Sequence, residues 1–152
     1  MTSHAAPHPH EASCIFCKII RGEIPAAKVL ETADAVAFLD IQPVLPGHVL
    51  LVPKQHHANL VELPDDLAAR TAALLPELCR AIRAATGADG FNVIINNGRA
   101  AGQVVEHGHW HIIPRFHNDP IVWPWPHSEY VGDERGQMCF RIQRELNPDR
   151  DD

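Results

Sequence analysis

Short apolar segments alternate along this chain with segments of helical spacing. Where apolar and β-favouring residues run for a few positions between turn residues, the pattern predicts strands. The predicted strands span residues 27–31, 35–39, 48–53 and 91–96, and a last one begins near Val104 and ends at Arg115. The turn-like sequence between the first two strands favours a hairpin.

Helical spacing of apolar residues predicts a short helix over 14–20. Ser13 can cap its N-terminus, and Gly22 can end it. The longest helix is expected over 64–87, where leucines recur at helical spacing and Pro76 bends the middle.

The order of these elements indicates the fold class. Connections between neighbouring strands are short enough for antiparallel pairing. The continuous apolar run over 48–53 is typical of a buried central strand. We therefore predict an α+β fold, with an antiparallel sheet of about five strands, one long helix and a short N-terminal helix.

Composition divides the chain into three parts. Residues 1–12 are polar and interrupted by proline, which predicts a disordered tail. Residues 13–117 carry the predicted sheet, and a chain of 152 residues with 45% hydrophobic content suffices for one core. Residues 118–152 form a C-terminal extension with a predicted helix over 133–146. Its tryptophans, Trp123 and Trp125, can anchor it to the domain, cover a pocket or fill a dimer contact.

The charge of the chain excludes some classes of function. A formal net charge of -6 argues against a protein that binds nucleic acid through its charge, because such proteins carry a basic stripe. No apolar stretch is long enough to span a bilayer, and the first residues lack the pattern of a secretory leader. We therefore expect a cytoplasmic protein.

Histidine occupies every second position over 107–111. In an extended strand, side chains at alternate positions share one face, so His107, His109 and His111 would form a row. Imidazole can serve as nucleophile, proton carrier or metal ligand near neutral pH. The row predicts a site for phosphoryl chemistry or metal binding, and a solvated histidine-rich edge is the alternative.

Cys14 and Cys17 form a Cys-x-x-Cys pair. In a cytoplasmic chain this spacing indicates metal binding or redox chemistry before a structural disulfide. A redox role has less support, since no strand of the thioredoxin kind precedes the pair.

These motifs together make the sequence resemble the histidine triad family of nucleotide-binding proteins, in its phosphoramidase-like branch. The matching segments follow the family's order from about Ser13 to Phe116: residues 14–20 with 22–25, 37–41, 46–48, 52–56, 96–98, 102–103, and the triad closing in Pro114-Arg115. The resemblance implies a two-fold homodimer that joins two sheets into one. It also implies cleavage at the α-phosphate of purine nucleoside phosphoramidates or of dinucleoside polyphosphates.

The resemblance assigns a role to each matching residue. His109 would be the nucleophile that forms a nucleotidyl-histidine intermediate, with one ring nitrogen held protonated by a carbonyl of the neighbouring loop. His111 would act as general acid or contact the phosphate. The remaining implied contacts are a base slot of Phe16, Ile20 and Phe38, ribose contacts from Asp40 and Ile41, and phosphate or leaving-group contacts from Asn96, Gly102 and Gln103.

Several of these positions have a simpler interpretation. Asp40 can be a loop aspartate that caps a turn, and Gln103 can be a turn residue. The residues of the base slot would look identical as core residues. Val104 departs from the family, because many relatives carry there a serine or threonine that contacts phosphate. A nucleotide-binding interaction module with little turnover, or a dinucleoside polyphosphate hydrolase, therefore remains an alternative.

In relatives with the cysteine pair, His56 and the first triad histidine complete a metal site. The resemblance thus implies a closed, structural Cys₂His₂ zinc site formed by Cys14, Cys17, His56 and His107. The alternative is a site without metal, in which His107 holds the loop by hydrogen bonds. His48 and His57 are interpreted as structural or solvated.

Overall fold

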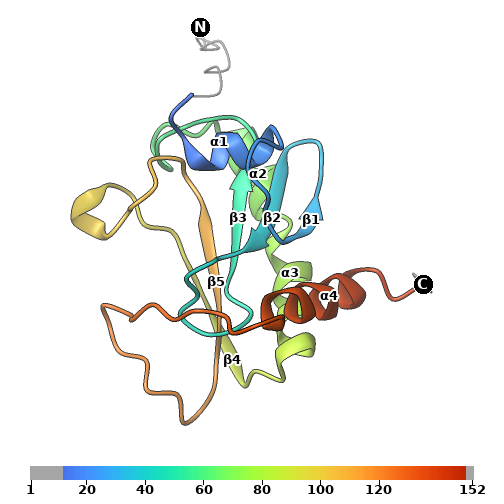
Figure 1. The fold of residues 1–152 in the computed structure, drawn as a ribbon. Coiled ribbons are helices and arrows are strands. Elements are labelled where there is room, and N and C mark those ends of the chain that lie inside the picture. Colours follow the sequence, from blue (N-terminus) through green and yellow to red (C-terminus); the bar gives the residue numbers. More distant parts are fainter. Residues whose placement is uncertain (1–11, 150–152) are drawn as a thin grey trace, which may run out of the picture.

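A five-stranded antiparallel sheet organises the chain (Figure 1). The computed structural model describes residues 12–149, so the tail predicted for 1–12 lies outside the described residues except for Ala12. The strand order is β1-β2-β3-β5-β4. The strands are β1 (Lys28–Glu31), β2 (Ala35–Leu39), β3 (Val49–Pro53), β4 (Gly90–Ile94) and β5 (Trp110–Arg115). The predicted α+β class, the hairpin and the buried central strand β3 are confirmed.

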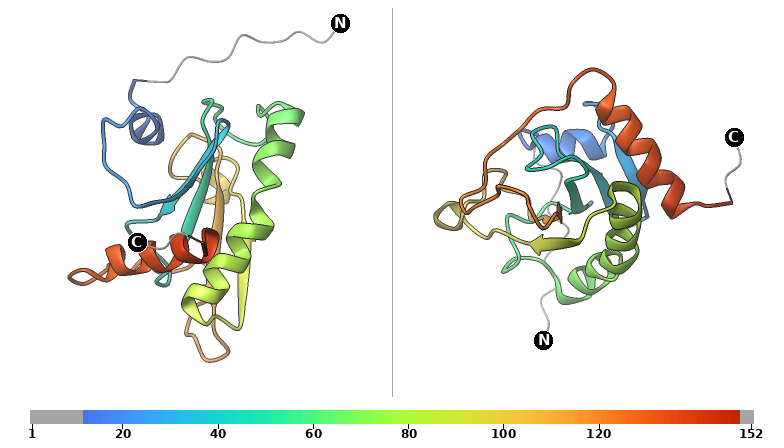
Figure 2. Two further views of the ribbon diagram at one scale, coloured as in Figure 1. Left: turned by 90° about the vertical axis from the view of Figure 1, so that its right-hand side faces the viewer. Right: turned by 90° about the horizontal axis from the view of Figure 1, so that it is seen from below.

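The helices lie on both sides of the sheet (Figure 2). Helix α1 (Ile15–Ile20) lies on one side, and α2 (Asp65–Ala72) and α3 (Leu75–Thr86) lie on the other. Helix α4 (Glu134–Leu146) packs against α3 and β1, and a short 3-10 helix spans Arg99–Ala101. Within the described residues 12–149, no helix is long and apolar enough to cross a membrane.

Alternation along the strands separates two apolar clusters. On β2 and β3, one set of alternate residues packs with α2, α3 and α4 through Leu67, Leu78 and Ile142. The other set, Val36, Phe38, Leu50 and Val52, packs with α1. Because successive strand side chains point to opposite faces, the sheet presents a separate surface to α1. That surface carries the candidate site.

The predicted long helix over 64–87 is two helices. The first ends at Ala72, and Pro76 occupies the first turn of α3. Proline is tolerated in a first turn, where its missing N–H costs no hydrogen bond, but it interrupts a helix interior. The prediction of one bent helix was therefore wrong, whereas its end at Gly87, with a left-handed φ of 69°, is confirmed.

Other predicted boundaries were also wrong, two of them beside the candidate site. Cys14, not Ser13, caps α1, since its Sγ accepts a hydrogen bond from the N–H of Cys17. The histidine strand begins at Trp110 and not near Val104. Before Trp110 the N–H of Gly108 donates to the carbonyl of His57, which lies in a loop, so no strand ladder forms there.

Candidate active site and metal cluster

The register of β5 brings the end of the triad to the face that α1 covers. His111 pairs with Leu50 of β3, and Leu50 belongs to the apolar cluster under α1. Its neighbours Trp110 and Ile112 belong to the opposite cluster. The alternation inferred from the sequence therefore holds at His111, although the strand covers only the last of the three histidines.

His109 has one of its ring nitrogens fixed by the backbone. Its Nδ1 lies 2.6 Å from the carbonyl oxygen of His107. A carbonyl only accepts hydrogen bonds, so Nδ1 carries the proton and Nε2 presents a lone pair. The acceptor is a backbone carbonyl, as expected, and it belongs to His107 in the loop directly before β5.

Burial keeps the triad histidines neutral. Removal from water lowers the pKa of His109, and the hydrogen bond to the carbonyl of His107 opposes this effect in part. Burial, together with the nearby His109 and His127, lowers the pKa of His111 to about 3. Both imidazoles are therefore uncharged at neutral pH, the form in which a ring nitrogen can act as a nucleophile.

His48, interpreted from the sequence as structural or solvated, is connected directly to the triad. It is 1% exposed, and its Nδ1 accepts a hydrogen bond of 3.1 Å from the N–H of Val44. Its Nε2 must then carry the proton, which it donates to Nδ1 of His111 at 2.9 Å. This bond leaves the proton of His111 on Nε2. His109 is thus protonated on Nδ1 and His111 on Nε2, so that at Nε2 His109 presents a lone pair and His111 presents a hydrogen.

Cys14, Cys17, His56 and His107 converge between α1 and the triad. Their four ligand atoms lie within 4.8 Å of one another. Nδ1 of His107 lies 3.4 Å from Sγ of Cys14 and 3.6 Å from Sγ of Cys17, and 3.2 Å from Nδ1 of His56. Sγ of Cys17 lies 3.4 Å from Nδ1 of His56. These residues form a cluster that can hold a metal ion.

The spacing of the cluster fits a tetrahedral zinc ion. With ordinary zinc bond lengths, tetrahedral geometry places two nitrogens about 3.3 Å apart and a nitrogen and a sulfur about 3.5 Å apart. The distances above agree with these values. Nε2 of His107 also donates to the carbonyl of Pro53 at 2.7 Å, which leaves the lone pair of Nδ1 facing the cluster.

The expected base slot is apolar and lies beside the triad. The ring of Phe16 lies edge-on to two neighbouring rings. Its centroid is 5.0 Å from that of His109 and 5.5 Å from that of Phe38. Ile20 packs partly buried against the same cluster. Ile41 is 62% exposed. The apolar surface around Phe16 thus borders the imidazole ring of His109.

Asp40 uses one carboxylate oxygen to hold its own loop. Its Oδ1 accepts from the N–H of Gln42 at 2.9 Å, which is the turn-capping contact considered from the sequence. Its Oδ2 lies 3.8 Å from Nε2 of His48. Burial raises the pKa of this carboxyl group, and the bond to Gln42 opposes the rise.

The residues expected to contact phosphate differ in their freedom to do so. The side-chain amide of Gln103 accepts from Gly98 and donates to the carbonyls of Ala58 and Val105. The N–H groups of Gly102 and Gln103 donate within the same turn. Both residues therefore hold the loop, and their expected contact with phosphate stays a prediction.

Asn96 differs from Gln103, because its side-chain amide does not hold the loop. Asn96 is 8% exposed, and no hydrogen bond of its side-chain amide is found within residues 12–149. A nearly buried amide without a partner is suited to a polar ligand. Val104 is 88% exposed and contributes only an apolar side chain.

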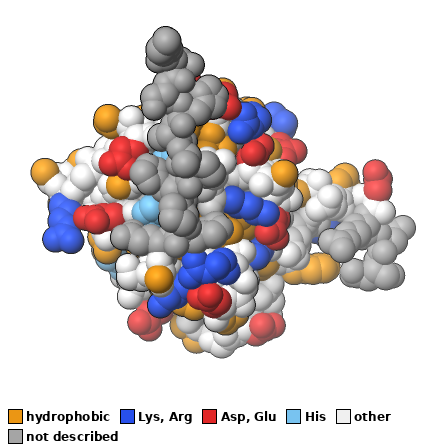
Figure 3. Space-filling model, turned by 90° about the horizontal axis from the view of Figure 1, so that it is seen from above, with side chains coloured by type: hydrophobic (Ala, Val, Ile, Leu, Met, Phe, Trp, Pro, Cys, Tyr) orange, Lys and Arg blue, Asp and Glu red, His pale blue; other side chains and the backbone are white. Residues whose placement is uncertain are grey.

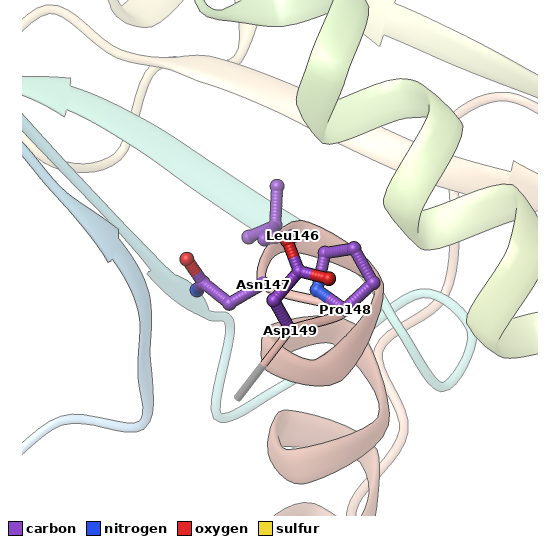
Figure 4. Close-up of a pocket in the computed structure, with 4 residues that line it drawn as sticks. All are labelled: Leu146, Asn147, Pro148 and Asp149. Atoms are coloured by element: carbon purple, nitrogen blue, oxygen red, sulfur yellow. The ribbon is translucent and has the colours of Figure 1, made fainter. Parts of the chain in front are cut away.

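Two open pockets lie away from these residues. One, of about 400 Å³, is lined by Leu146 to Asp149 after α4 (Figure 4). None of the expected site residues contributes to its lining. In the part of Figure 3 that is not drawn in grey, histidine side chains occupy only small areas of the surface.

Comparison with known proteins supports the resemblance. The family model of the HIT domain matches residues 21–118. The chain is 41% identical over 146 residues to the adenosine 5′-monophosphoramidase of Saccharomyces cerevisiae, covering 95% of this chain and 90% of the relative. It is 42% identical over 137 residues to an adenylylsulfatase of Arabidopsis thaliana, covering 88% and 69%.

A solved structure with a similar fold is that of a zinc-bound histidine triad family protein from Mycobacterium smegmatis. It is 34% identical to this chain, with a TM-score of 0.81, and the match covers 90% of this chain and 94% of the other. The family model spans more than half of this chain, and the two curated relatives exceed 40% identity. The chain therefore belongs to the HIT domain family.

Proposed function

We propose that the protein is a nucleotide hydrolase or transferase that cleaves purine nucleoside phosphoramidates at the α-phosphorus. The proposal rests on the hydrogen bond that Nδ1 of His109 donates to the carbonyl of His107. Because the proton lies on Nδ1, Nε2 of His109 keeps a lone pair that can attack phosphorus. Relatives named adenosine 5′-monophosphoramidase and adenylylsulfatase support the reaction class, since both names describe cleavage next to an adenylyl phosphorus.

The reaction would proceed in two displacements. Nε2 of His109 forms a bond to phosphorus while the bond from phosphorus to the leaving nitrogen breaks, which gives a nucleotidyl-histidine. Water then attacks the same phosphorus and releases the nucleotide and free His109. Dividing one displacement into two lets the imidazole serve as both nucleophile and leaving group.

His111 would assist departure of the leaving nitrogen as a hydrogen-bond donor, and the leaving amine would take its proton from water. Nε2 of His111 bears a hydrogen that can bond to a phosphate oxygen or to the leaving atom.

The nucleoside would lie against the apolar surface beside α1. Phe16, Ile20 and Phe38 offer a slot for a purine base, with Ile41 beside the ribose. Asp40 keeps Oδ2 for the ribose hydroxyls while Oδ1 holds its loop. The unpartnered amide of Asn96 is suited to the phosphate or the leaving group.

We propose that the cluster of Cys14, Cys17, His56 and His107 holds a structural zinc ion. Four protein ligands would close the coordination sphere, so zinc there would supply folding energy and no activated water. Within the chain, such a site would tie α1 to the residue whose carbonyl orients His109.

We also propose a homodimer formed across β4. This strand lies at an edge of the sheet, and Phe91 and Val93 are 41% and 40% exposed. Beside it, a groove of about 440 Å³ is lined by Phe91 and by residues of α3, namely Leu75, Pro76, Cys79, Arg80 and Arg83. An exposed apolar edge strand is suited to pairing with a second copy.

The division of the chain remains a proposal as well. The HIT domain over 13–117 would hold the site, and the extension over 118–152 would pack on the domain, as supported by burial of Met138 and Ile142 in the main core. A cytoplasmic location and the absence of nucleic acid or membrane partners stay predictions.

Turnover of defined substrates tests the proposed function. Purified protein is incubated with adenosine 5′-phosphoramidate or diadenosine tetraphosphate, and AMP release is followed by chromatography. We expect AMP from the phosphoramidate, reduced at least about a thousandfold in His109→Ala. His117→Ala is the matched control, because the side chain of His117 is 85% exposed.

The outcomes separate the alternatives. Cleavage of the tetraphosphate alone would favour a dinucleoside polyphosphate hydrolase. Nucleotide binding without turnover of either compound would favour the interaction module and point to Val104. Equal activity of His109→Ala and the parent protein would refute the proposed mechanism.

A further inference from the structure

The two cysteine sulfurs of the metal cluster are close enough to react with each other. Sγ of Cys14 and Sγ of Cys17 lie within 4.8 Å of one another. The N–H of Cys17 donates to Sγ of Cys14 at 3.4 Å, so the capping contact of α1 already turns this sulfur towards its partner. Closing a disulfide bond therefore requires movement of these two side chains and not of the elements that carry them.

The two sulfurs differ in their access to solvent. Cys14 is 8% exposed, and the residues before it, Ala12 and Ser13, are exposed. Cys17 is 0% exposed. A small oxidant from solution therefore meets Cys14 first, and Cys17 lies behind it as the residue that can close the disulfide bond.

The other cysteines of the chain are less suited to oxidation. Burial raises the pKa of the Cys79 thiol and of the Cys139 thiol, which lowers the fraction of reactive thiolate. Cysteine bound to a metal ion is a thiolate, so Cys14 and Cys17 would be held in the reactive form. The pair beside α1 is therefore the preferred target of an oxidant.

A disulfide between Cys14 and Cys17 would remove the connection that the cluster makes. The cysteines belong to α1 and its cap, whereas His56 and His107 belong to loops of the sheet. A metal ion held by all four residues joins α1 to these loops. A disulfide joins Cys14 only to Cys17 and consumes both thiolate ligands, so the metal ion and this connection are lost together.

Phe16 carries the change from the cysteines to the candidate active site. It lies between them in the sequence, and its ring centroid lies 5.9 Å from that of His107 and 5.0 Å from that of His109. Helix α1 has 6 residues and is too short to be stable without its contacts. Loss of the metal ion therefore loosens Phe16 beside the nucleophile and in the expected base slot.

We propose that Cys14 and Cys17 form a peroxide-sensitive switch, in which an intramolecular disulfide releases the metal ion and weakens nucleotide binding. This inference rests on the proposed zinc site and the proposed function, and it adds regulation by oxidation to both.

Hydrogen peroxide is the oxidant, and the cysteine pair supplies both electrons. The Cys14 thiolate attacks one peroxide oxygen, which forms an S–O bond, breaks the O–O bond and releases hydroxide. The Cys17 thiolate then attacks Sγ of the Cys14 sulfenic acid, which forms the S–S bond, breaks the S–O bond and releases a second hydroxide. A dithiol reductant reverses the oxidation by thiol–disulfide exchange.

Peptide mapping tests the modification. The zinc-loaded protein is treated with hydrogen peroxide, the remaining thiols are alkylated, and the tryptic peptide that ends at Lys18 is weighed by mass spectrometry. This peptide contains Cys14 and Cys17 and no other cysteine. We expect it to lose two hydrogens and to escape alkylation, while a chromogenic chelator detects one zinc ion released per disulfide.

Two variants control this experiment. In Cys14→His a nitrogen ligand replaces the sulfur and no disulfide can form, so zinc should stay bound at the same peroxide concentration. Cys139→Ser should form the disulfide and release zinc as the parent protein does, because its Sγ lies outside the cluster. A parent protein that carries no zinc, forms no disulfide, or forms it without losing zinc would overturn the proposal.

Binding of AMP tests the consequence for the active site without turnover. Calorimetry compares the reduced, zinc-loaded protein with the oxidised protein. We expect the dissociation constant of AMP to rise about tenfold on oxidation, the size expected for loss of one aromatic contact, and to return after treatment with dithiol and zinc. An unchanged dissociation constant would overturn the switch.

Hydrogen exchange keeps this inference apart from the proposed function. A reduced protein that binds no AMP and cleaves no phosphoramidate would refute the proposed function. Faster exchange of the α1 amides after oxidation would then still support the switch, and unchanged exchange would overturn it.

Discussion

Two backbone groups decide what the triad histidines can do. The carbonyl of His107 fixes the proton of His109 on Nδ1, and the N–H of Val44 fixes that of His48 on Nε2. His48 then fixes His111 as a donor at Nε2. The neighbouring imidazoles thus present a lone pair and a hydrogen, which are the two groups that displacement at phosphorus requires.

His48 should therefore affect the rate through His111. In His48→Phe the N–H donor to Nδ1 of His111 is lost, and we expect kcat to fall on the order of tenfold to a hundredfold. His48→Gln should recover part of this loss, since its amide can also donate. Steady-state kinetics with the adenosine phosphoramidate checks both variants, and equal losses in the two would contradict a role through the tautomer.

At this scale the sequence predicted the types of residue better than their contacts. The alternating histidines and the cysteine pair were visible as spaced motifs, and the structure brings the four predicted metal ligands together. His48 was missed, although its position directly before a buried strand was a usable signal. The role of Gln103 depends on three partners in loops, which no spacing along the chain encodes.

Among the elements, α1 depends most on the metal cluster. It has 6 residues, and isolated helices of that length are not stable in water. Two of its anchors, Cys14 and Cys17, belong to the cluster. The proposed zinc would therefore hold α1, and with it Phe16, against the sheet.

Removal of one ligand tests this dependence. We expect one zinc per chain by elemental analysis, and its loss in Cys17→Ser with a fall in the free energy of unfolding of about 3 kcal/mol, measured by urea denaturation in the presence of zinc. Cys139→Ser is the control, because its Sγ lies outside the cluster and donates to the carbonyl of Lys28. Full zinc content in Cys17→Ser would contradict the assigned ligands.

Element boundaries were predictable where local chemistry decides them. The bounds of β2 agree with the prediction because turn residues stand on both sides of its apolar run. The sequence predicted a bend where the structure has a break between α2 and α3, because leucine spacing continues across Pro76. The start of β5 was wrong because pairing with β3 and β4, and not local propensity, determines where the ladder begins.

At the scale of the whole molecule, the edge strand β4 is the feature on which the proposed homodimer depends. We expect light scattering at micromolar concentration to give twice the chain mass of 16.8 kDa. Phe91→Asp should shift the mass to that of a monomer, because it places a charge on the exposed edge. Phe140→Asp alters an aromatic residue of α4 with 49% exposure, and it should remain a dimer. A monomeric parent protein would contradict the proposed assembly.

The C-terminal extension marks the limit of what the sequence predicted for the molecule. Its helix was expected over 133–146 and is found over Glu134–Leu146. The path of residues 123–130 was not predictable, because it is fixed by hydrogen bonds between residues more than eighty positions apart. Ser128 donates to the carbonyl of Pro43, and the N–H of Gly47 donates to the hydroxyl of Tyr130. Proximity of Trp125 to His111, whose ring centroids lie 5.5 Å apart, follows from that path alone.

The stereochemistry of hydrolysis at phosphorus tests the central claim most directly. One diastereomer of an adenosine α-thiophosphoramidate is hydrolysed in water enriched in a heavy oxygen isotope, and the configuration of the product is determined. Attack by His109 followed by attack of water inverts phosphorus twice, so the account predicts retention of configuration. Inversion would mean that water attacks directly, and it would contradict a nucleotidyl-histidine intermediate.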